Sequence, residues 1–296
     1  MQDKNIEQDS KFSFKKLWEY MGPGWLMYQS YLDPGNLESD LQTGAISGYS
    51  LLWLLLWSHL ISLVFQLLSA KLGIVTGKHL SELIRQHYSS KLAHTFWICV
   101  QLAMIGSDAL QVVGTAVALH ILLGCPVWLA VLMTLMDIVT CTWIQKKSVH
   151  QIEILCVILV SFIASCFWYE CFQSKPQIMD IFKGFVPSVP RHTEFQSVAI
   201  VGAVVIPHNM FLHSALVSCS KQKREAQFYF SLESGLTLGV SFLVNMAIVI
   251  VFAQVFYKET MIHLPGLMDA DTVLVKTLGF TAKYVWAVGL LVGKEI

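Results

Sequence analysis

Two tetrapeptides of the same form, Asp33-Pro34-Gly35-Asn36 and Ile206-Pro207-His208-Asn209, each interrupt a long apolar segment of the chain. Proline removes a backbone donor and clashes with the preceding turn, so each segment is predicted to divide into two half-helices. Inside a bilayer, broken backbone persists only where protein or an aqueous cavity satisfies the freed groups. Paired interruptions at matching positions of two halves are typical of the substrate site of a secondary transporter.

The apolar segments themselves predict an all-α, polytopic membrane protein. Of the 296 residues, 55% are hydrophobic and 14% charged, and several apolar runs reach the roughly 20 residues that cross a bilayer core. We expect a single membrane domain over 21–296, with seven full spans and a partial eighth at 284–292. The seven spans are expected at 21–46, 51–74, 96–123, 127–144, 152–172, 198–217 and 230–256, and an external loop at 257–283.

The N-terminus is predicted to be a cytosolic tail over residues 1–20. Its polar start lacks the short apolar core and cleavage site of a secretory signal. With the N-terminus in the cytosol, most lysines and arginines of the loops fall on the cytosolic side, as the positive-inside rule requires.

Several other classes of function find no support. The net charge is zero, which gives no reason to expect a nucleic-acid partner. The seven cysteines show no CxxC spacing, so neither a zinc site nor a disulfide framework is indicated. No nucleophile–base pairing, phosphate-binding loop or HExxH motif suggests an enzyme, and no resident cofactor is expected.

The first break carries the residues best suited to hold a cation. Asp33 and Asn36 flank an unwound Pro-Gly, and the half-helix before it presents carbonyls, including that of Ser30, at the negative end of its dipole. A lone carboxylate at mid-bilayer costs roughly 2.5–3.5 kcal/mol, so it needs a counter-charge. Apart from Lys71 near the end of the second span, no lysine or arginine lies in the seven expected spans, which leaves a bound cation or a proton. The alternative is a simple kink in which Asp33 caps the second half-helix.

The second break repeats this arrangement. The half-helix that ends near Ile206 offers the carbonyl of Ala203, and His208 and His213 follow on the second half. An intramembrane histidine can carry a proton or ligate a transition metal, but either one can also be a hydrogen-bonded packing residue.

Both segments resemble the signature motifs of the Nramp family, whose usual forms are Asp-Pro-Gly-Asn and Met-Pro-His-Asn. The similarity runs from about Phe12 to Leu291 and is greatest to the animal branch. It implies a LeuT-like inverted-repeat fold, and proton-coupled transport of divalent metals such as Mn²⁺ and Fe²⁺ by alternating access. The metal and the protons would then be cargo and coupling ions rather than cofactors.

The resemblance also implies roles for individual residues. The metal ligands would be Asp33, Asn36 and the carbonyls of Ser30 and Ala203. The family's proton route would pass through Asp33, His208 and Asp108. Further acidic positions along the scaffold are Asp137 and Glu153, and His213 is a further candidate for this route.

Some positions depart from the family pattern. Ile206 stands where the family has methionine, so the thioether that favours transition metals is missing and selectivity could extend to Mg²⁺ or Ca²⁺. Met210, one turn later, is a possible substitute. At two positions where the family has glutamate, this chain has Gln101 and Gln111, whose side chains cannot change charge.

The length is the last departure, because family members continue through several more helices beyond Leu291. The second repeat is therefore expected to be incomplete, and a truncated isoform is an alternative interpretation. Such a chain could be a non-transporting regulator that associates with a full-length relative. The resemblance allows either the plasma membrane or an endosomal or lysosomal membrane.

Overall fold

The computed structural model describes residues 30–134, 149–218, 223–257 and 266–292. Within these ranges the chain is helical and contains no strand. The elements are η1 (Ser30–Leu32), α3 (Pro34–Ser47), α4 (Leu52–Thr76), α5 (Leu80–His87), α6 (Ser90–Leu123), α8 (Val149–Gln173), α9 (Ile178–Lys183), α10 (Glu194–Val204), α11 (Pro207–Ser218), α12 (Lys223–Phe256), α13 (Asp269–Leu278) and α14 (Phe280–Val292).

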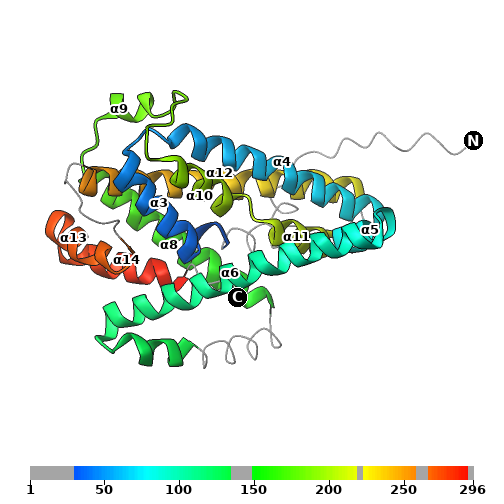
Figure 1. The fold of residues 1–296 in the computed structure, drawn as a ribbon, viewed down its shortest axis with the longest axis horizontal. Helices are drawn as coiled ribbons and strands as arrows, with labels where there is room; N and C mark the ends of the chain where they lie inside the picture. Colours follow the sequence, from blue (N-terminus) through cyan, green and yellow to red (C-terminus); the bar gives the residue numbers. More distant parts are fainter. Residues whose placement is uncertain (1–29, 135–148, 219–222, 258–265, 293–296) are drawn as a thin grey trace, which may run out of the picture.

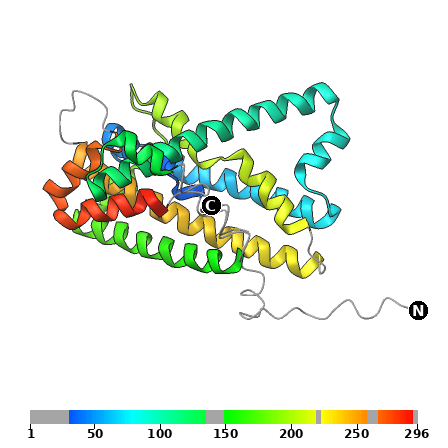
Figure 2. The same ribbon diagram turned by 90° about the horizontal axis from the view of Figure 1, so that it is seen from below.

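The helices form an elongated bundle (Figure 1). Figure 2 shows α6 along one side of the bundle and α8 along the opposite side, with α12 and α14 between them. The most extensive helix–helix interface joins α3 to α12, followed by those of α4 with α11 and with α12. The half-helices that carry the two breaks are therefore both held against long, continuous helices.

The helices extend beyond the apolar runs that predicted them. The helices α6 and α12 begin at Ser90 and Lys223, several residues before the runs at 96 and 230, because a helix can continue into polar sequence outside a bilayer. The predicted external loop at 257–283 is wrong in part, since it contains α13 and the start of α14. Ala270 and Leu274 of α13 are fully buried, so packing stabilises this short helix. Residues 135–144 of the expected fourth span lie outside the described residues.

A tightly packed aromatic centre joins α8, α12 and α14. Trp286 is fully buried and meets Phe252 and Phe167 edge-on, at ring-centroid distances of 5.2 and 6.4 Å. Its indole N–H donates to the carbonyl of Leu267, 3.0 Å away. This arrangement satisfies the only polar atom of the side chain while the ring fills the core.

Glycines bring several helix backbones into close contact. A Cβ on Gly44 of α3 would lie 2.5 Å from the carbonyl oxygen of Val249 and 2.9 Å from the nitrogen of Ala253 on α12. A Cβ on Gly114 of α6 would lie 2.2 Å from the Pro34 side chain. Small residues at such contacts are how membrane helices gain packing energy without a hydrophobic driving force.

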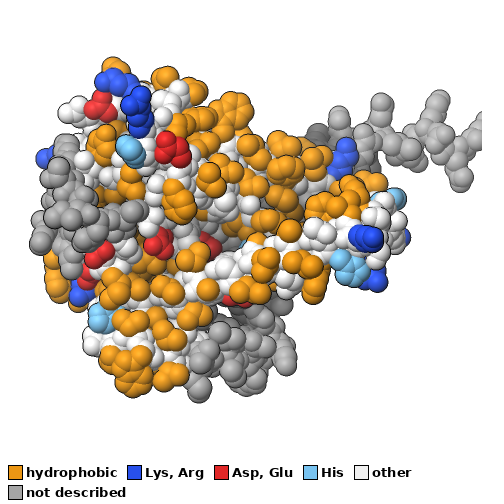
Figure 3. Space-filling view, in the orientation of Figure 1, with side chains coloured by type: hydrophobic (Ala, Val, Ile, Leu, Met, Phe, Trp, Pro, Cys, Tyr) orange, Lys and Arg blue, Asp and Glu red, His pale blue; other side chains and the backbone are white. Residues whose placement is uncertain are grey.

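The exterior is that of a membrane protein. Figure 3 shows hydrophobic side chains over much of one face, with lysines and arginines toward its two ends and some acidic side chains nearer its middle. Among the described residues, four helical segments are long and apolar enough to cross a membrane: Leu52–Thr76, Ser90–Leu123, Glu194–Ser218 and Gln227–Phe256.

Candidate functional site

The first break is organised by Asp33 and Asn36. Asp33 has extended backbone angles and caps α3, because its Oδ1 accepts the backbone N–H of Asn36 at 2.6 Å. The side-chain Nδ2 of Asn36 donates to the same Oδ1 at 2.9 Å and to the carbonyl of Ser30 at 3.0 Å. Asp33 is therefore a capping residue. Its carboxylate and the carbonyl of Ser30 both lie within hydrogen-bonding distance of the Asn36 amide.

The second break leaves a comparable carbonyl. The helix α10 ends at Val204, and the N–H of Val205 still reaches the carbonyl of Val201. The carbonyl of Ala203 would receive its helical bond from residue 207, which is a proline and has no N–H. Ser30 stands in the same relation to Pro34, four residues later.

The two breaks match residue by residue at one spacing in the chain. Ser30, Pro34 and Asn36 correspond to Ala203, Pro207 and Asn209, each pair 173 residues apart (203 − 30, 207 − 34, 209 − 36). The proline and the asparagine therefore occur twice at equivalent positions, whereas Asp33 corresponds to Ile206.

These two breaks meet in the structure. The hydroxyl of Ser30 donates to Oδ1 of Asn209 at 3.0 Å, although the residues are 179 positions apart. Ser30 and Asn209 are 4% and 3% exposed, and Asp33 is 6% exposed. The Nδ2 of Asn209 has no partner among the described residues. A buried polar cluster thus joins the two unwound segments.

Neighbouring helices hold this cluster in place. The hydroxyl of Tyr31 shares a 2.9 Å hydrogen bond with Ser62 of α4, and the ring of His59 lies 6.2 Å from that of Tyr31. On the other side, Ser69 of α4 donates to the carbonyl of Met210. The helix α4 therefore touches both breaks and fixes their relative position.

Ile206 occupies the apolar wall of the cluster. It is 8% exposed and belongs to the same hydrophobic cluster as Tyr31 and Val204. Met210 lies one turn further along α11 and is partly buried. The side chain next to the second break is consequently a hydrocarbon rather than a thioether.

The residues expected to carry protons are more dispersed. His208 is partly exposed at the start of α11, whereas His213 is fully buried, and neither of its ring nitrogens has a partner among the described residues. Asp108 lies exposed on α6, two positions before Leu110, whose side chain packs close to Gly35. Asp137 lies outside the described residues, as does the side chain of Glu153.

The composition of the cluster limits its chemistry. In the described ranges no group of three or more His, Cys, Asp or Glu side chains converges as a metal site would. A cation at the breaks would therefore be held by one carboxylate together with amide and carbonyl oxygens, a set that suits hard or borderline ions.

Sequence reasoning gave Asn209 no role, although it faces Ser30. Its match to Asn36 at the 173-residue spacing is the signal that could have identified it. The contact of His59 on α4 with Ser241 on α12 had no comparable signal in the sequence.

Comparisons with known proteins identify the family of the chain. Residues 24–293 match the family described as natural resistance-associated macrophage protein-like, or Nramp. The chain is 44% identical over 298 residues to the metal transporter nramp1 homolog of Dictyostelium discoideum, covering 97% of this chain and 56% of that protein. It is 42% identical to metal transporter Nramp4 of Arabidopsis thaliana, with coverages of 95% and 57%. The chain thus spans about half the length of the curated relatives it matches.

Solved structures give the same result. A mutant of the Eremococcus coleocola manganese transporter superposes with a TM-score of 0.84 at 30% identity, covering 98% of this chain and 65% of that one. The same transporter in complex with an aromatic bis-isothiourea substituted compound gives the same values. These matches confirm the predicted all-helical, LeuT-like inverted-repeat fold, in an integral, multi-pass membrane protein.

Proposed function

We propose that the chain, which belongs to the Nramp family, carries divalent transition-metal ions of the Mn²⁺ and Fe²⁺ type across a membrane by alternating access. The observation that carries this proposal is the buried contact of Ser30 with Asn209, because it brings the two unwound segments together. The names of the relatives, which are metal transporters, support the same class of substrate.

In this proposal four residues form the cage for the ion. Asp33 supplies the negative charge, and Asn36 turns its amide so that Oδ1 faces the ion. The carbonyls of Ser30 and Ala203 complete the set, since Pro34 and Pro207 cannot occupy them with helical N–H donors. The cation in turn compensates the buried carboxylate, which is otherwise costly inside a membrane.

Protons are the proposed coupling ions. Asp33 and His208 lie at the breaks, and Asp108 lies on the helix that packs against Gly35, so a proton could pass between groups of different helices. His213 and the acidic residues Asp137 and Glu153 are the further candidates. The proposal requires only that metal and proton occupy Asp33 at different stages.

Uptake by the reconstituted chain tests the proposal. We expect proteoliposomes that contain the 296-residue chain to accumulate Mn²⁺, and to do so faster when the outside is more acidic than the inside. Protein-free liposomes of the same lipid provide the control. Uptake equal to that control at every pH gradient would contradict the proposed function.

A second candidate function, transport with relaxed selectivity, is favoured by the buried position of Ile206. Without a thioether at the cage, oxygen ligands alone discriminate poorly between Mn²⁺ and alkaline-earth ions. We expect millimolar Ca²⁺ to compete with Mn²⁺ uptake by the wild type. In Ile206→Met we expect the ratio of the apparent Ca²⁺ to Mn²⁺ affinity constants to fall by about tenfold, equivalent to roughly 1.4 kcal/mol.

A matched replacement separates sulfur chemistry from side-chain shape. Ile206→Leu keeps an apolar side chain of similar volume, so its competition profile should equal that of the wild type. The absence of Ca²⁺ competition in the wild type, or equal shifts in the methionine and leucine variants, would rule out this explanation of selectivity.

A further inference from the structure

A line of polar side chains continues along α3 beyond the first break. After Asn36 come Ser39, Asp40, Thr43 and Ser47. Each lies three or four positions from another member of this set, which places them on one side of the helix. All of them are buried. Ionisable residues inside membrane segments are costly and mark pathways for ions or substrates.

Three of these side chains have polar atoms without partners. Asp40 is 3% exposed and Thr43 1% exposed, yet Oδ2 of Asp40, Oγ1 of Thr43 and Oγ of Ser39 have no hydrogen-bond partner among the described residues. Each buried polar group left in this condition costs about 1–3 kcal/mol. Three such groups within two turns of helix indicate a binding site for an ion or a polar ligand.

A fourth unpartnered group comes from α12. Gly44 meets Val249, and Gly48 meets Tyr257, so α3 and α12 run in the same direction along their interface. One turn before Gly44 is Asp40, and one turn before Val249 is Asn245, which is fully buried with neither Oδ1 nor Nδ2 bonded in the described part of the chain. The register of the two helices therefore places this amide at the level of Asp40.

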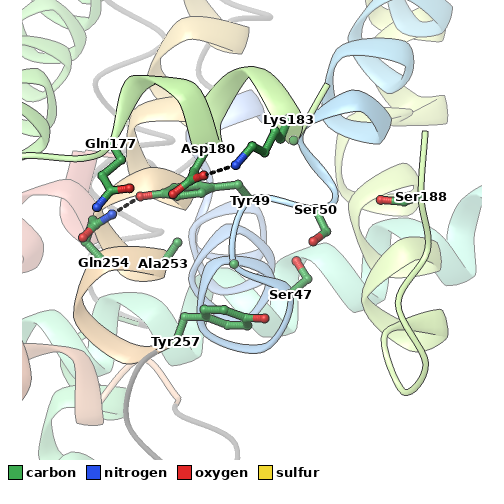
Figure 4. Close-up of a pocket in the computed structure, with 12 residues that line it drawn as sticks. Ser47, Tyr49, Ser50, Gln177, Asp180, Lys183, Ser188, Ala253, Gln254 and Tyr257 are labelled. Atoms are coloured by element: carbon green, nitrogen blue, oxygen red, sulfur yellow. Dashed lines mark hydrogen bonds and ion pairs between the residues drawn. The ribbon is translucent and has the colours of Figure 1, made fainter. Parts of the chain in front are cut away.

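The same line leads to a cavity of about 480 Å³ at the C-terminal end of α3 (Figure 4). Ser47 connects the polar side chains of α3 with the cavity. It lines the cavity, and its hydroxyl donates to the carbonyl of Thr43 at 2.7 Å. Among the described residues that line the cavity, Asp180 is the only carboxylate, and it is paired with Lys183 at 2.8 Å. The described part of the cavity wall therefore carries no net charge. Of the polar side chains that follow Asn36 along α3, Asp40 is the acidic one whose Oδ2 has no partner among the described residues.

We propose that Asp40, the hydroxyls of Ser39 and Thr43 and the amide oxygen of Asn245 form a second divalent-cation site, between this cavity and the central break. Carboxylate, amide and hydroxyl oxygens are ligands for hard divalent ions. Asp40 lies seven residues after Asp33, or about 10 Å along the helix, which separates the two sites enough for successive occupancy. This inference rests on the proposed function, because it assumes that the ion also visits Asp33.

Counting bound Mn²⁺ tests the second site. We expect the full chain in lipid nanodiscs to bind two Mn²⁺ ions, and Asp40→Asn and Asp33→Asn to bind one each. Thr43→Val removes one hydroxyl at nearly constant volume and should weaken one of the two sites by about tenfold while the other is unchanged. Glu38→Gln is the matched control, because Glu38 is a half-buried carboxylate on another side of α3, and it should retain two ions.

The outcomes distinguish this site from the central one. A single Mn²⁺ in both the wild type and Asp40→Asn, with uptake intact and lost in Asp33→Asn, would overturn the second site and leave the proposed function standing. No bound Mn²⁺ in the wild type would overturn both. Two ions in Asp40→Asn together with a reduced proton flux would show that this carboxylate carries a proton, and would also overturn the proposal.

Discussion

Replacing Asp33 by asparagine is expected to reduce Mn²⁺ uptake by at least about 100-fold. Changing a residue that merely supports a metal ligand already costs 10–100-fold in affinity, so loss of the only carboxylate in the cage should reach or exceed the upper end. Asparagine keeps an oxygen that can accept the N–H of Asn36, so the cap on α3 persists while the charge is removed. Radiotracer uptake measures the loss of transport, and equilibrium Mn²⁺ binding measures the loss of affinity.

The capping role of Asp33 dictates the controls. Asp33→Ala removes both the charge and the cap, and it should cost a further 0.5–2 kcal/mol or so of stability, which appears as a lower melting temperature than that of Asp33→Asn. Glu38→Gln should transport like the wild type. Uptake by Asp33→Asn within twofold of the wild type would mean that Asp33 is only a cap, the alternative that its contact with Asn36 left open.

The second large effect is structural. Gly44→Val should destabilise the bundle by about 3 kcal/mol, because any Cβ at this position lies 2.5 Å from a carbonyl oxygen and 2.9 Å from a backbone nitrogen of α12. Backbone atoms cannot rotate away, so α3 must move away from its largest interface. Thermal unfolding in detergent and the monodisperse yield both report this loss.

Gly239→Ala on α12 is the matched control for this substitution. No atom lies within 4 Å of a Cβ placed there, and the position is helical, so alanine should be neutral or slightly stabilising. Equal melting temperatures for Gly44→Val and the wild type would contradict the close packing of α3 against α12.

The sequence allowed the two breaks to be predicted because their cause is local. Proline cannot donate, and polar residues beside it stand out in an apolar run, so Pro34 and Pro207 locate the unwound segments without any knowledge of tertiary structure. The long helices could be predicted for the same reason, since each is continuously apolar over a bilayer's width.

The parts that were missed depend on contacts between distant residues. No local sequence pattern predicts that Ser30 contacts Asn209, or that Gly44 packs against Val249. Asp40 escaped attention because a single carboxylate seven residues after Asp33 looks like part of the same motif until its burial is known. The short helix α13 lies where the sequence predicts a loop, because packing rather than length stabilises it.

The most direct test of the account is the position of a bound Mn²⁺ ion in an experimental structure of this chain, located by its anomalous scattering. We expect a peak enclosed by oxygens of both breaks: the carboxylate of Asp33 and the amide of Asn36 on one side, and the carbonyl of Ala203 on the other. A peak that touches residues of only one break, or none beside Asp33, would contradict the claim that the two unwound segments form a single site.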